Sequence, residues 1–133
     1  MLNNPAINNL ALLAARVMLS VMFIKAGYDK FAAFGGGGVQ KYMESAGVPG
    51  MLLPLVILAE IGLGLMVLVG FKTRWAALGL AGFTLLAALL FHFKLSDNVQ
   101  YLFFMKNIGI AGGFLALMVA GAGTYSMDAK RGE

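Results

Sequence analysis

Four apolar stretches dominate this 133-residue chain, and each is long enough to cross a lipid bilayer as a helix. They cover residues 10–26, 51–70, 75–93 and 101–122. Charged residues make up only 12% of the chain, whereas soluble domains carry about 25%. A bilayer offers no water to the peptide groups, so separate spanning segments must be helical. We therefore predict an all-α membrane protein with a single four-helix transmembrane domain over residues 1–133.

The polar connections between these stretches predict how the helices are arranged. Residues 71–74 and 94–100 are short connections, which make the neighbouring helices antiparallel. The first connection, residues 27–50, is longer and contains four consecutive glycines, after which VQKYMESAG has apolar residues at helical spacing. These features predict an up-down-up-down bundle with a short interfacial helix in the first loop. The polar tail TYSMDAKRGE is expected to be frayed.

Charge and composition limit the classes of partner. The net charge of +4 is scattered between the apolar stretches, without the basic stripe of a nucleic-acid-binding protein, so the expected partner is the lipid bilayer. The basic residues slightly favour a topology with both termini in the cytoplasm. The pair Gly109 and Gly113 favours close helix packing within the bundle, and contact between copies in a homo-oligomer is the alternative use of such a small-residue face. The chain has no cysteine, which excludes disulfides and thiolate sites.

Glu60 lies near the middle of the second apolar stretch, where it requires an explanation. A carboxylate at that depth costs roughly 2.5 to 3.5 kcal/mol on insertion scales. From the rise per residue, Arg16 and Lys106 are placed on either side of Glu60 in depth, so either could be its partner. Such a pair would offset part of the desolvation cost. The residues leave two roles open for Glu60, a lock between helices and a contact to a substrate, ligand or proton.

The first apolar stretch has a defined inner face. Arg16, Ser20, Phe23 and Gly27 recur at helical spacing, and this stripe is predicted to face the bundle interior. Lys25 is about half a turn away around the helix and is expected to point elsewhere.

The remaining polar candidates lie in the third and fourth stretches. His92 is the only histidine, and without neighbouring ligands at metal-binding spacing it predicts no metal site. It is expected to contact the surroundings of Lys106 across the short connection. No catalytic motif is present, so no catalytic residue is assigned. The predicted polar core or ligand-binding set is Arg16, Glu60, His92, Lys106 and Asn107.

Several ordered motifs resemble the DoxX family of small four-helix bacterial membrane proteins, over about residues 12–128. They are Arg16 with AGYDK at 26–30, AGVPG at 46–50, LVILAEIGLGL around Glu60, GFKTRWAAL around Arg74, LLFH ending at His92, FMKNIGIAGGFL around Lys106 and Asn107, and GAGTYSMD. The GAG in the last motif replaces a more usual GPG and affects a turn. The resemblance implies a multi-pass protein of the bacterial inner membrane. It also implies an association with membrane redox systems, since family branches include a quinone-reducing complex and an oxidative-stress assembly.

Three hypotheses follow. The first is an accessory subunit, not catalytic alone, that supports redox or stress-defence proteins and binds a quinone-like or other small amphipathic molecule in the polar core. If it were enzymatic, it would be a quinone-linked oxidoreductase subunit. The second is a structural interaction module whose ion pairs only lock the helices. The third is a proton or small-solute transporter.

Overall fold

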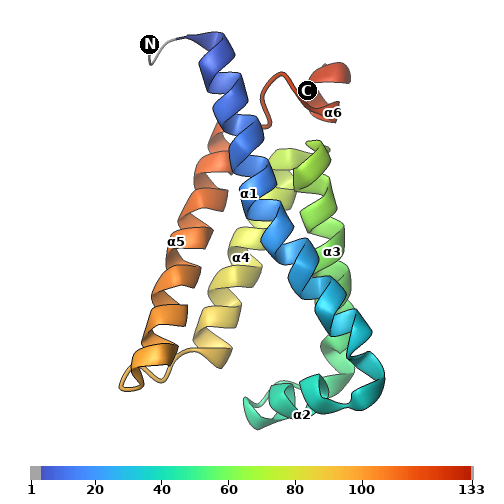
Figure 1. Cartoon of the computed structure of the whole chain (residues 1–133), viewed down its shortest axis with the longest axis vertical. Helices are drawn as coiled ribbons and strands as arrows, with labels where there is room; N and C mark the ends of the chain where they lie inside the picture. The colour runs from blue at the N-terminus through green and yellow to red at the C-terminus, as the bar shows by residue number, and fades with distance from the viewer. Residues whose placement is uncertain (1–3, 133) are drawn as a thin grey trace.

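The computed structural model describes residues 4–132 and confirms the predicted four-helix membrane bundle. In chain order, the helices are α1 (Pro5–Ala32), the 3-10 turn η1 (Phe34–Gly36), α2 (Gly38–Ser45), the 3-10 turn η2 (Gly50–Leu52), α3 (Leu53–Val69), α4 (Thr73–Phe91), α5 (Asn98–Ala120) and α6 (Met127–Lys130). The four long helices alternate in direction, and both ends of the chain lie at the end opposite α2 (Figure 1).

Local chemistry sets the ends of these helices. The Asn4 side chain accepts hydrogen bonds from the Ala6 and Ile7 amides and caps α1, and Asp97 caps α5 in the same way. Gly70 caps the C-terminal end of α3, and its φ of 73° is left-handed and favours glycine. The four-glycine segment overlaps η1 and leads into α2, which is the short helix that the sequence predicted in the first loop.

The bundle is built from two helix pairs, α1 with α3 and α4 with α5. Gly27 and Gly64 lie where α1 and α3 approach most closely, because a Cβ atom on either would come within 3 Å of an isoleucine side chain of the other helix. A core that includes Phe23, Leu80 and Phe114 joins the two pairs. The pairs diverge toward the α2 end, and α2 lies across that end (Figure 1).

The C-terminal tail is docked, and the expectation that it would be frayed is wrong. Ser126 and Asp128 are buried, with 7% and 8% of their surfaces exposed. The carbonyl of Tyr125 accepts a hydrogen bond from Arg16, and the Asp128 amide donates to the carbonyl of Gly70. The tail therefore ties the end of the chain to α1 and to the turn between α3 and α4.

Candidate functional site

A cavity of about 560 Å³ lies between the two helix pairs at the α2 end of the bundle. Its walls are mostly apolar side chains from α1, α2, α3, α4 and α5. The polar or ionisable residues on the wall include Lys30, Glu60, Thr84, His92 and Asn107. We call this space the inter-pair cavity. Few polar groups on an apolar wall are typical of a site for a small amphipathic molecule.

Glu60 on the cavity wall pairs with Lys30. Glu60 is only 4% exposed, and its Oε1 lies 2.9 Å from Nζ of Lys30. The predicted partners, Arg16 and Lys106, are therefore wrong. The predicted first span ended at residue 26, whereas α1 continues to Ala32 and carries Lys30 past Glu60.

The close approach of α1 and α3 explains why these two charges meet. A Cβ atom on Gly27 would lie 3.1 Å from Cβ of Glu60, so the backbones nearly touch at that level. Lys30 is the next residue after Gly27 on the same helix face. The stripe of Arg16, Ser20, Phe23 and Gly27 is buried as predicted. Continuing that stripe by one step would have identified Lys30.

Asn107 of α5 reaches the cavity from the opposite pair. Its Nδ2 donates a long hydrogen bond of 3.4 Å to the backbone carbonyl of Thr84. The Thr84 hydroxyl is engaged elsewhere, since it donates to the carbonyl of Leu80 at 2.6 Å. Asn107 therefore lines the cavity from the α4–α5 side, whereas Glu60 and Lys30 line it from the α1–α3 side.

His92 lines the cavity near the end of α4, whereas Lys106 does not line it. The Nδ1 atom of His92 lies 2.9 Å from Oε1 of Gln100, and its ring centroid is 5.3 Å from that of Phe103. The Lys106 ammonium is exposed and lies 5.8 Å from the centroid of the same Phe103 ring. The predicted contact of His92 with the surroundings of Lys106 is confirmed. The cavity brings together Glu60, His92 and Asn107 from the predicted set.

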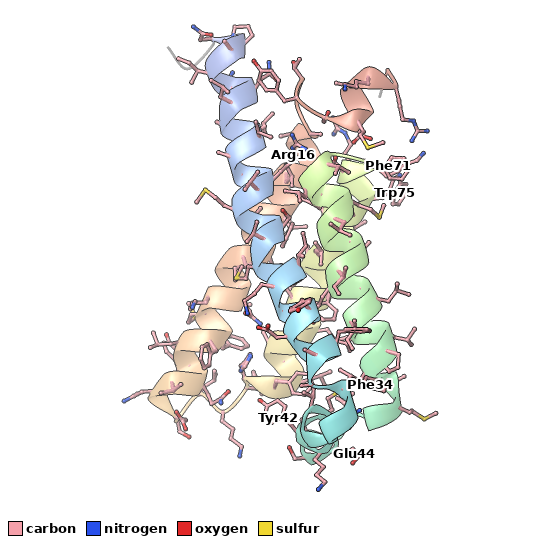
Figure 2. All side chains as sticks on the ribbon, turned by 45° about the vertical axis from the view of Figure 1, so that its right-hand side comes forward. Arg16, Phe34, Tyr42, Glu44, Phe71 and Trp75 are labelled. Carbon is pink, nitrogen blue, oxygen red and sulfur yellow. The ribbon has the colours of Figure 1, made fainter. Side chains whose placement is uncertain are left out.

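Arg16 belongs to a separate polar site at the other end of the bundle. It is fully buried, and its Nη1 donates to the carbonyls of Leu68 at 3.1 Å and Val67 at 3.4 Å, while Nη2 donates to the carbonyl of Tyr125. A cation at the last carbonyls of a helix is favourable. Arg16 therefore caps the C-terminal end of α3 and anchors the tail by its hydrogen bond to Tyr125. Figure 2 shows Arg16 beside the turn that contains Phe71.

Asp128 was not expected from the sequence, and it caps α4 from the tail. Its carboxylate accepts from the Lys72 amide at 2.7 Å and the Thr73 amide at 2.9 Å. Lys72 has a left-handed backbone with φ of 50°, which these bonds help to hold. Burial by itself would raise the pKa of Asp128, but the hydrogen bonds from Thr73 and Lys72 and the charge of Arg131 outweigh burial and lower this pKa.

Sequence comparisons place the chain among bacterial membrane proteins. The DoxX family model matches residues 11–93. The chain is 50% identical to inner membrane protein YqjF of Escherichia coli (strain K12) over 122 residues, which cover 92% of each chain. It is 33% identical to inner membrane protein YphA of the same organism over 126 residues, which cover 90% of this chain and 89% of YphA. No solved structure matches.

Proposed function

This chain belongs to the DoxX family of inner-membrane proteins, and from that membership we propose that it is an accessory subunit of a membrane redox or stress-defence system. In this role it binds a quinone-like or similar small amphipathic molecule in the inter-pair cavity. It is a multi-pass protein with four membrane-spanning helices. The redox part of the proposal comes from the family resemblance, and the ligand part comes from the cavity.

The observation that supports ligand binding most directly is the placement of an ion pair with a buried carboxylate, Glu60, on the wall of a mostly apolar cavity. A volume of about 560 Å³ lies within the range of roughly 300 to 1,000 Å³ that small-molecule sites occupy. Lys30 and Asn107 can each donate to a carbonyl oxygen of a quinone head group. The side chains of Phe23 and Phe83 supply apolar surface for its ring.

A structural lock is the second candidate, and it is favoured by the position of the same ion pair. Lys30 and Glu60 connect α1 to α3 beside Gly27, where the two helices lie closest. Ion pairs that fix the register between helices can be retained for that reason alone. The ligand role predicts that a substitution of Glu60 weakens ligand binding first, whereas the structural lock predicts that it destabilises the fold first.

The test uses Glu60→Gln, Lys30→Met and the double variant in full-length protein in lipid nanodiscs. A ligand role predicts that each variant binds a soluble benzoquinone at least about tenfold more weakly, a loss of about 1.4 kcal/mol in binding free energy. The double variant should then bind no more tightly than either single variant. A lock predicts a loss of roughly 3 kcal/mol in unfolding free energy for each single variant, largely restored in the double variant.

The exposed pair Lys25 and Asp29 provides the matched control. Its charges lie on α1 and are joined at 2.7 Å, but the side chains are 70% and 56% exposed. Lys25→Met should change neither binding nor stability beyond a few tenths of a kcal/mol. Unchanged quinone binding in Glu60→Gln and Lys30→Met protein that is still folded would eliminate the proposed ligand contact.

A further inference from the structure

We propose that the molecule held in the inter-pair cavity carries a long apolar chain that leaves the cavity between α3 and α4. The ligand is then a membrane-resident molecule with a carbonyl or hydroxyl head and an extended hydrocarbon tail, and it enters sideways from the bilayer. This inference rests on the proposed function, because it concerns the same cavity. It adds the ligand class and the route.

Packed side chains lie at both ends of the cavity along the bundle axis. Toward the termini, the Phe23 ring packs edge-on against Phe83 at 6.4 Å and against Phe114 at 5.5 Å between centroids, which fills the space between the helix pairs. Toward the other end, α2 covers the cavity. Its Met43 is 4% exposed, and its Tyr42 ring stacks on Phe91 of α4 at 5.5 Å. A ligand with a long chain therefore has no straight route along the axis.

Contacts also join the two helices within each pair along the cavity wall. In the first pair, Gly27 and Gly64 bring the backbones of α1 and α3 together, and the ion pair of Lys30 and Glu60 spans the same seam. In the second pair, Asn107 of α5 is bonded to the backbone of α4 at Thr84. The remaining routes lead outward between the two pairs.

The wall of the cavity changes from polar to exposed apolar toward α3 and α4. Leu55 of α3 and Leu86 and Leu90 of α4 line the cavity and are 61%, 56% and 40% exposed. These three leucines face lipid in a four-span membrane protein. Glu60, in contrast, is buried at the inner wall. This gradient matches a molecule whose head lies inside and whose tail passes the leucines into the bilayer.

The tail adds little affinity in a membrane, because lipid is as apolar as leucine. Its passage is instead a matter of space, so a larger side chain at the exit should obstruct a tailed ligand and leave a tailless one unaffected. The probes are a benzoquinone with a decyl chain and the same head group without a chain. Binding is measured to full-length protein in lipid nanodiscs, with empty nanodiscs subtracted.

The variants are Leu86→Trp and Leu90→Trp on α4 and Leu55→Trp on α3. We expect at least about tenfold weaker binding of the decyl compound, because forcing extra volume into a packed space is costly, and less than about twofold change for the tailless one. Leu89→Trp and Leu58→Trp are the matched controls, since these leucines are 55% and 67% exposed but do not line the cavity. Both controls should bind both probes normally.

Three results would overturn the inference, and they are distinguishable. If wild-type protein binds neither probe, the proposed quinone site fails and this inference fails with it. If wild-type protein binds both probes but the three exit variants treat them alike, the ligand site stands and the exit is wrong. Met22 of α1 also lines the cavity and is 42% exposed. Selective loss of the decyl compound in Met22→Trp alone places the exit between α1 and α5 and refutes the proposed route.

Discussion

Replacing Asp128 by asparagine tests whether the C-terminal tail stabilises the bundle. The carboxylate accepts one backbone amide on each oxygen, from Lys72 and from Thr73, at the N-terminal end of α4. Asparagine keeps one acceptor oxygen and turns an NH₂ group toward the other amide. One charge-assisted hydrogen bond is therefore lost, together with the favourable interaction of a negative charge with the helix N-terminus.

The expected cost is about 2 kcal/mol of unfolding free energy, within the range for a hydrogen bond to a charged group and for loss of an N-cap. Unfolding is followed by helical circular dichroism during titration of detergent-solubilised protein with sodium dodecyl sulfate. Trp75, the only tryptophan, lies two residues after Thr73 and reports on the same region by fluorescence.

Asp29→Asn is the control, because Asp29 is exposed and pairs with the exposed Lys25. It should change stability by a few tenths of a kcal/mol at most. If Asp128→Asn and Asp29→Asn had the same unfolding midpoint, the docked tail would contribute nothing measurable and the capping argument would be refuted.

Three further outcomes follow from the same structure. The pKa of Asp128 is lowered, so its contribution to folding stability is present above the ordinary aspartate pKa of about 3.9 and is lost as the pH falls through the folded-state pKa. The difference in unfolding free energy between wild type and Asp128→Asn should therefore shrink in acid. Gly27→Ala should destabilise by roughly 1 to 3 kcal/mol, because its Cβ would lie 2.6 Å from Ile61 Cγ1. Gly62→Ala should stabilise by up to about 1 kcal/mol, because among residues 4–132 its Cβ would meet no atom within 4 Å outside its own stretch of α3. Thermal unfolding of both variants checks this, and shifts of the same sign would contradict it. Arg16→Met should cost roughly 3 kcal/mol and increase cleavage of the tail by added protease, since the carbonyls that Arg16 satisfies would lose their donor; unchanged tail cleavage would argue against its anchoring role.

The number of helices and the inner face of α1 could be predicted because each depends on a local pattern. Apolar length decides which segments span a bilayer, and helical spacing decides which side chains share a face. The burial of Arg16, Ser20, Phe23 and Gly27 follows from that spacing alone.

The partners across helices could not be predicted in the same way. Their depth along the bundle made Arg16 and Lys106 candidate ion-pair partners of Glu60. Depth alone does not determine which helix is the neighbour of α3 or how closely that helix approaches. Glycine at position 27 was interpreted as the start of a loop, whereas it allows α1 to pass against α3 and brings Lys30 to Glu60. Asp128 was missed because its cap acts on residues more than fifty positions away. Whether Glu60, His92 and Asn107 bind a ligand stays a prediction.

The contact between Arg16 and the tail has a consequence for the order in which the protein matures. Arg16 is made 109 positions before Tyr125, whose carbonyl it binds, and all four long helices lie before Tyr125 in the chain. During synthesis, α1 therefore enters the membrane with a guanidinium that still lacks this acceptor. The terminal end of the bundle reaches its final form only when residues 125–128 have left the ribosome, so assembly of this end is a late event of biogenesis.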